Sequence, residues 1–227
     1  MSKFDKILPT TLRNRIAEEI RSAILDGSLK PGERIIERKL MTEFGASLGV
    51  IREALVELET EGFIVKRPNA DTRVLRITVK EAAKIFALRR LLEPYAAGQA
   101  AVRATSDQVT DIEVRLEKMI DMARQSAILA YMHEDYGWHE AVWTAGNNPY
   151  IRAALRRCVL PLSMFAAISG QSTFDLVEDA VSHTPVVDAI KRRDAAAAEA
   201  VMRERIGMWE ASSHNYLVFQ PVESSPS

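Results

Sequence analysis

Three absences narrow the class of protein before any motif is considered. The 227 residues contain a single cysteine, Cys158, so no disulfide bond can form within the chain. The apolar residues near 159–168 are interrupted by Pro161 and are too few to span a membrane. The charges nearly cancel, with 30 basic and 31 acidic side chains, so the net charge does not indicate a nucleic-acid partner. The sequence therefore lacks the features of a small disulfide-bonded domain and of a membrane protein.

What the sequence does have is the composition of a globular protein. Hydrophobic residues make up 47% of the chain and charged residues 27%, a balance that argues against extensive disorder. The length suits two domains rather than one. The first residues carry charges with no long apolar segment behind them, so we expect no secretion signal and a cytoplasmic location.

The first third of the chain predicts three helices followed by a β-hairpin. Apolar residues recur at helical spacing from Leu12 to Ile24, and glycines follow each helical pattern. Two short runs rich in β-formers then flank a Pro-Asn turn. The predicted elements are helices at residues 12–26, 37–44 and 47–61, and strands at residues 63–66 and 73–77. This order is the plan of a winged helix-turn-helix.

Everything after residue 78 predicts helix. Thr78 and Glu81 have the spacing of a capping box, which places a helix start at about Val79. The predicted helices cover residues 79–104, 106–124, 128–145, 149–168, 176–192 and 195–212. We therefore expect a mainly α protein with three parts: a winged helix-turn-helix domain at residues 1–77, an all-α helical bundle at residues 78–218, and a flexible tail at residues 219–227.

The third predicted helix is the candidate for reading DNA. A recognition helix enters the major groove with its N-terminal turns against base edges and phosphates. Basic residues on the preceding helix and on the first wing strand would reach flanking phosphates and position the protein. The candidates for contact with double-stranded DNA are Arg38, Ser47, Gly49, Arg52, Lys66 and Arg67.

Four segments of this region occur in a characteristic order. They are Ala23-Ile24-Leu25-Asp26-Gly27, Leu29-Lys30-Pro31-Gly32-Glu33, Arg52-Glu53-Ala54-Leu55 and Leu58-Glu59-Thr60-Glu61-Gly62-Phe63. With them, residues 12–77 resemble the winged-helix domain of GntR-type regulators. The resemblance implies that Arg38, Ser47 and Arg52 contact DNA.

The chain departs from that family pattern at three positions. Leu48 stands where the family usually has an arginine, Val50 where it often has a proline, and Asp71 near a wing-tip position that is usually glycine. A bidentate arginine contributes ~1–3 kcal/mol to base discrimination. Its loss, together with a wing-tip acid that phosphate would repel, predicts weaker or differently specified DNA binding.

A second set of segments marks the helical region. They are Leu88-Arg89, Leu92-Glu93-Pro94, Asp135-Tyr136-Gly137-Trp138-His139, Gly146-Asn147-Asn148-Pro149-Tyr150, and His183 ahead of Ala189-Ile190. With them, residues 79–213 resemble the FCD domain of the FadR-type branch of the same family. The resemblance implies a domain that senses a small molecule, and, together with palindromic DNA sites, it implies a homodimer.

Asp135 and His139 are the chemical centre of the helical region. Four residues apart on a helix, they project from one face, and a carboxylate with an imidazole suits a divalent metal such as zinc. The resemblance adds His183 as a third ligand, whereas Arg205 stands where a further histidine is expected. Two outcomes stay open: an ion bound by the three ligands, or a lost metal with Arg205 paired to Asp135 or to an effector carboxylate. An ordinary surface Asp–His pair is the third interpretation.

The same resemblance indicates an effector site. Arg89 matches an inward-facing arginine of the family, and with Asn148 and Arg205 it could bind a small organic acid. For Arg89 the alternative is a salt bridge to Glu93 one helical turn away.

We therefore expect a transcription regulator whose affinity for DNA is controlled by a small molecule, with a carboxylate as the expected ligand, and which is not an enzyme. Two alternatives stay open. One is a metal-dependent enzyme that uses Asp135, His139 and His183 to activate water. The other is a regulator-like protein that has lost specific DNA binding.

Overall fold

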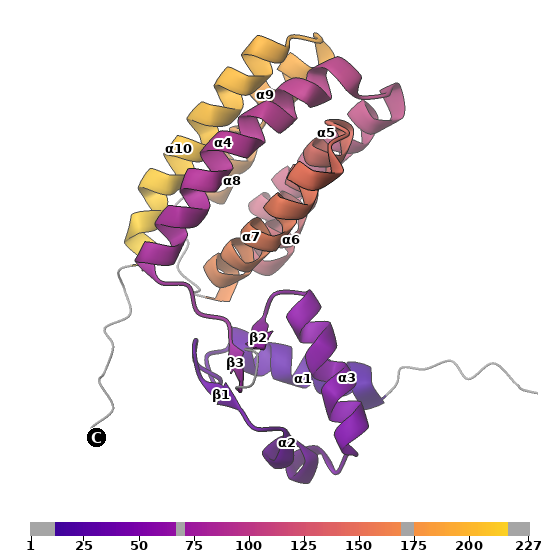
Figure 1. The fold of residues 1–227 in the computed structure, drawn as a ribbon, viewed down its shortest axis with the longest axis vertical. Coiled ribbons are helices and arrows are strands. Elements are labelled where there is room, and N and C mark those ends of the chain that lie inside the picture. Colours follow the sequence, from indigo (N-terminus) through magenta and orange to yellow (C-terminus); the bar gives the residue numbers. More distant parts are fainter. Residues whose placement is uncertain (1–11, 67–70, 169–174, 218–227) are drawn as a thin grey trace, which may run out of the picture. The chain divides into compact units, whose positions relative to one another are not determined.

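The computed structural model describes residues 12–66, 71–168 and 175–217 (Figure 1). The chain divides into two compact units, Met1–Arg76 and Ile77–Ser227. Among the described residues, no helix combines the length and the apolar composition that a bilayer span requires.

The first unit contains three helices and a small sheet. The helices are α1 (Leu12–Leu25), α2 (Glu37–Phe44) and α3 (Leu48–Thr60), and the strands are β1 (Arg34–Ile35), β2 (Ile64–Lys66) and β3 (Thr72–Val74). Helices α1 and α3 pack against each other through apolar faces in which Ile16, Ile20, Ile51, Leu55 and Leu58 are buried. Helix α2 ends at Gly45, whose φ of 60° is the left-handed conformation that glycine adopts at low cost.

The sheet has one strand more than the sequence predicts. Its order is β1-β3-β2, and both pairings are antiparallel. Strand β1 follows the Pro31-Gly32 turn, where the Gly32 N–H donates to the Val74 carbonyl and the Val74 N–H donates to the Glu33 carbonyl. A strand of two residues is too short to have a readable alternation, so the sequence indicated only a turn there.

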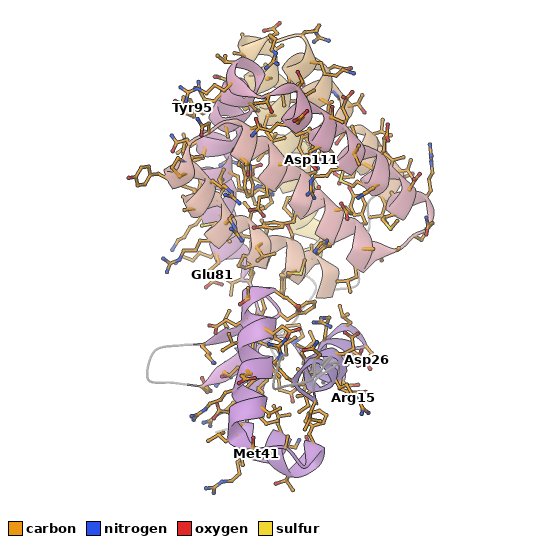
Figure 2. The ribbon with its side chains drawn as sticks, turned by 90° about the vertical axis from the view of Figure 1, so that its right-hand side faces the viewer. Arg15, Asp26, Met41, Glu81, Tyr95 and Asp111 are labelled. Atoms are coloured by element: carbon orange, nitrogen blue, oxygen red, sulfur yellow. The ribbon has the colours of Figure 1, made fainter. Side chains whose placement is uncertain are left out.

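The second unit is entirely helical. Its helices are α4 (Val79–Arg103), α5 (Ser106–Arg124), α6 (Ile128–Ala145), α7 (Pro149–Ile168), α8 (Leu176–Val181), α9 (Thr184–Lys191) and α10 (Ala195–Leu217). The predicted capping box forms: the Glu81 N–H donates to the Thr78 hydroxyl, and the Thr78 N–H donates to the Glu81 carboxylate. Figure 2 labels Glu81 at this end of the helical unit. Helices α4 and α10 run side by side along the bundle (Figure 1). The predicted fold class, a winged helix-turn-helix followed by a helical bundle, is confirmed.

The prediction of one helix over residues 176–192 is wrong. The chain forms α8 and α9 with a break at Ser182 and His183. Pro185 accounts for the break, because proline has no N–H to continue the preceding helix and is favoured in the first turn of a new one. The break places His183 at the N-cap of α9, where its side chain is fully buried.

Aromatic side chains fill the interior of the bundle. Trp138, Trp143 and Tyr131 on α6 are buried, and Trp143 packs with Leu155 and Val159 of α7. The turn between α6 and α7 lies against α4, since a Cβ on Gly146 would come within 2.8 Å of the Ala96 carbonyl oxygen. These contacts hold α4, α6 and α7 together around a common core.

Candidate functional site

The N-terminal turn of α3 is exposed. Ser47 occupies the N-cap position with extended backbone angles, but its hydroxyl makes no capping hydrogen bond, so the predicted cap is only positional. Gly49 is exposed as well, and a Cβ built on it would meet only the Ser47 hydroxyl, at 4.0 Å. Both residues therefore leave polar groups and backbone accessible at the end of the helix that would enter a groove.

Arg52 is held by a residue that the sequence analysis did not single out. Its Nη2 lies 3.1 Å from Oε2 of Glu37 on α2, and its Nε also donates to that carboxylate. More than half of the Arg52 side chain remains exposed, so this pair orients the guanidinium without burying it. Arg38, on the same helix as Glu37, is exposed.

The wing carries more balanced charge than the sequence suggested. Asp71 accepts from Arg73 at 2.6 Å and lies 3.4 Å from Nε of Arg34, and the hydrogen bond from Arg73 lowers its pKa. Two guanidinium groups accompany Asp71 and offset its negative charge, so its repulsion of phosphate is weakened. Lys66 is exposed at the end of β2, whereas Arg67 lies outside the described residues.

The second candidate site is a buried polar cluster inside the helical unit. Asp135 and His139 come from α6, His183 from the start of α9, and Arg205 from α10. All four side chains are buried, with His139 and His183 completely inaccessible. One ligand atom from each of Asp135, His139 and His183 lies within 4.8 Å of the others, so these three residues could hold a metal ion. The cluster is not a surface Asp–His pair.

Both imidazole rings are anchored through Nδ1. The Nδ1 of His183 lies 3.0 Å from the backbone carbonyl oxygens of Asp179 and Ala180, to which only a protonated nitrogen can donate. The Nδ1 of His139 lies 2.7 Å from Oε2 of Glu93, close enough for an ion pair although the N–H direction is not aligned for a hydrogen bond. Each ring thus turns Nε2 toward the cluster, the orientation that metal-binding histidines take.

Arg205 lies among the same atoms. Its Nη1 is 3.2 Å from Nε2 of His139, and its Nη2 is 3.3 Å from Oδ1 of Asp135 and 3.6 Å from Oδ2 of Asp179. Asp179 also accepts from the hydroxyl of Tyr131. The guanidinium therefore bridges α6 and α8 from its place on α10.

Burial and neighbouring charge set the ionisation of the cluster. Burial lowers the pKa of His183 to about 4, and Arg205 acts in the same direction, so the ring is neutral near pH 7. Burial alone would raise the pKa of Asp135, but His183, His139 and Arg205 outweigh it and hold that pKa below its usual range. Asp135 Oδ1 and His183 Nε2 are then two acceptors only 3.1 Å apart, an arrangement that needs a positive charge close by.

Arg89 makes the salt bridge that the sequence offered as its alternative role. It pairs with Glu93, and both side chains are almost completely buried. Burial opposes ionisation of Glu93, but the charges of Arg89 and His139 hold its pKa at about 2. The Arg89 guanidinium also lies 5.0 Å from the ring centre of Trp209. Arg89 therefore supports His139 through Glu93.

Asn148 has a different contact set from the one predicted. Its Oδ1 accepts from the N–H groups of Tyr150 and Ile151 at the start of α7. Among the described residues, these are the hydrogen bonds of the Asn148 side chain, and no hydrogen bond joins it to Arg89 or Arg205. The structure does not bring the three predicted effector ligands together.

A cavity of about 180 Å³ adjoins the cluster at Arg205. It is lined by Asp175, Glu178, Asp179, Ser182, Arg205, Met208 and Trp209. Arg205 is only 4% exposed, and its Nε has no hydrogen-bond partner in the described part of the chain. Asp179 and Tyr131 carry no signal in the sequence, because their roles arise only when distant helices pack together, and Glu93 was expected only as the partner of Arg89 and not of His139.

Each of the two units matches a known protein family. Residues 12–74 match the family described as bacterial regulatory proteins, gntR family, and residues 84–207 match the FCD domain. The chain is 24% identical over 211 residues to the probable D-xylose utilization operon transcriptional repressor of Paenarthrobacter nicotinovorans, covering 92% of both chains.

Two further proteins extend the comparison. The gluconate operon transcriptional repressor of Bacillus licheniformis is 28% identical over 188 residues, which are 79% of this chain and 76% of that one. Among solved structures, E. coli McbR/YncC has a TM-score of 0.68 at 18% identity, covering 92% of this chain and 100% of that chain, which supports the fold. Both curated relatives are named as transcriptional repressors, and the chain covers 92% and 76% of their lengths.

We expect the buried Arg89–Glu93 pair to be essential for the helical unit. Arg89→Ala leaves an uncompensated buried carboxylate, so the free energy of unfolding should fall by ~3–5 kcal/mol. All three tryptophans lie in this unit, so urea unfolding followed by tryptophan fluorescence reports on it.

Arg115→Ala is the matched control. It removes an exposed pair with Asp111 that has the same four-residue spacing. The control should cost less than ~1 kcal/mol. Equal losses in the two variants would contradict the role given to burial.

Proposed function

The chain belongs to the GntR family of bacterial regulatory proteins and carries an FCD domain, and from this premise we propose that it is a repressor controlled by a small organic acid. As a member, it is a DNA-binding transcription regulator with a C-terminal effector-binding domain. We infer repression, rather than activation, from the names of relatives such as the gluconate operon repressor. Because chromosomal DNA lies in the cytoplasm of bacteria, a cytoplasmic location is part of this proposal.

The exposed start of α3 carries the DNA-binding proposal. Ser47 has a hydroxyl that no helix cap uses, and Gly49 lets the backbone approach a duplex closely. Arg52 is exposed and oriented by Glu37. Arg38 and Lys66 would supply phosphate contacts on either side of the groove, with Arg67 as a further candidate.

A salt series separates the expected roles of the two arginines. With an operator obtained by selecting genomic fragments, Arg52→Ala should cost ~1–3 kcal/mol of binding free energy and relax base preference. Arg38→Ala should weaken binding to all DNA sequences alike and reduce the slope of log affinity against log salt concentration by ~1. Fluorescence anisotropy measures both quantities.

Arg124→Ala, an exposed arginine of the helical unit, is the control and should change neither quantity. A wild-type protein that prefers no fragment at any salt concentration would support the alternative in which specific DNA binding has been lost.

The cavity beside Arg205 carries the effector proposal. A buried guanidinium N–H without a partner favours an anionic group, and carboxylate is the group that arginine binds best. The remaining polar lining is mostly carboxylate, which would accept hydrogen bonds from hydroxyl groups of the ligand. A hydroxylated acid satisfies both conditions, and gluconate is the probe suggested by a relative.

Trp209 lines the cavity, so ligand binding should change tryptophan fluorescence. Gluconate should quench or shift this signal and lower operator affinity together. Arg205→Lys, which loses the forked geometry, should weaken gluconate binding ~10-fold or more, whereas Arg203→Lys on the exposed face of α10 should not. Binding that is equal in both variants would remove Arg205 from the effector site.

A second copy of the chain is the proposed protein partner. Leu91 (73% exposed), Tyr95 (44%, Figure 2) and Val102 (61%) lie along one face of α4, where large apolar side chains in water are typical of an interface. A dimer would present two winged heads to a palindromic site.

Sedimentation velocity tests this partner directly. Wild type should sediment as a dimer, and Leu91→Glu should sediment as a monomer. Val114→Glu, at a half-exposed apolar position on α5, should stay dimeric. A monomeric wild type would contradict the proposal.

Zinc is the cofactor that the FCD domain suggests, and the fit is incomplete. Two anchored imidazoles and a carboxylate are suitable donors. Arg205, however, already contacts two of the three donor atoms and cannot itself bind a metal. The same observation disfavours a metal-dependent enzyme, whose ion would need an open position for water.

A further inference from the structure

We propose that Arg205 is the resident cation of the buried cluster and takes the place of a divalent ion. In this protein the guanidinium joins Asp135 to His139, and the helical unit holds its structure without metal. The site would become a metal site on exchange of this one side chain for histidine.

The spacing of the donor atoms supports an arginine rather than an ion. Oδ1 of Asp135 and Nε2 of His139 are 4.0 Å apart. A tetrahedral zinc ion with bonds of ~2.1 Å would hold two ligand atoms at ~3.4 Å. The observed distance between the two ligand atoms is larger than that. The two terminal nitrogens of Arg205 lie 3.2 Å from Nε2 of His139 and 3.3 Å from Oδ1 of Asp135. The guanidinium therefore fits the separation that the structure has.

Charge supports the same assignment. Asp135 and Asp179 are both within 4 Å of Nη2 of Arg205, whose side chain is only 4% exposed. Arginine does not lose its proton in a protein, so this positive charge is permanent. A dication among the same atoms would meet the guanidinium in a medium of low dielectric constant, where like charges repel strongly.

The cluster nevertheless keeps its donors in position for an ion. His183 Nε2 has no hydrogen bond within the described residues. Arg205 donates to the other two ligand atoms, Nε2 of His139 and Oδ1 of Asp135, and not to this one. Removing Arg205 would leave the atoms of Asp135 and His139 unpaired as well. A histidine side chain is shorter than arginine, and a metal–nitrogen bond of ~2.1 Å covers most of the difference.

The experiment compares metal uptake by four full-length proteins: wild type, Arg205→His, Arg205→Ala and Arg203→His. Each is stripped with a chelator, titrated with Co²⁺ and followed by the visible absorption of tetrahedral cobalt, with zinc content measured by mass spectrometry after dialysis. Arg205→His should bind one equivalent, and Arg205→Ala should bind more weakly. Wild type and Arg203→His, whose new histidine is exposed, should bind at least ~10-fold more weakly than Arg205→His.

One equivalent bound by wild type would overturn the proposal, because the guanidinium would then yield its place, for example by moving into the adjoining cavity. No binding by either Arg205 variant would also overturn it, since the donors would not be organised for an ion. If Arg205→His fails to fold by circular dichroism, the wild type and Arg205→Ala decide the question.

A second measurement separates this inference from the proposed function. The thermal unfolding temperature and the operator affinity of wild type should both be unchanged by a chelator. A loss of either on chelation would show that a metal supports the protein. The effector response could fail without affecting this result, because metal uptake is measured without effector or DNA.

Discussion

The helical unit depends on pairing charges that have been removed from water. Arg89, Glu93, Asp135 and Arg205 are all buried, and an unpaired charge in such a place would cost several kcal/mol. Their contacts form a chain: Arg89 to Glu93 on α4, Glu93 to His139 on α6, and His139 to Arg205 on α10. Each member is stable only in the presence of the next, so the polar contacts specify how these three helices are arranged, whereas the apolar core alone would tolerate other arrangements.

Much of the fold follows from local sequence patterns. Helices α5, α6 and α7 have the predicted bounds, and the capping box at Thr78 begins α4 as expected, because these signals depend only on neighbours in the chain. The two misses have local causes as well. Pro185 divides the predicted helix at residues 176–192, and β1 is too short to leave a pattern.

The candidate site could be predicted only in part. Residues four apart on one helix, such as Asp135 and His139, reveal their common face in the sequence. The contacts of Glu93 with His139 and of Asp179 with Arg205 are not visible in this way, because these partners lie on helices that are distant in the chain. The contacts of Asp71 in the wing could not be predicted either. In the sequence Asp71 is an isolated acidic residue, and the pairing of β1 with β3 brings Arg34 close to it beside Arg73.

Arginine at position 205 also has a meaning for the history of such proteins. Two of the arginine codons differ from the two histidine codons by a single base, so one point mutation can exchange a fixed organic cation for a third imidazole. A lineage could therefore pass between dependence on a scarce nutrient metal and independence of it without rebuilding the surrounding helices.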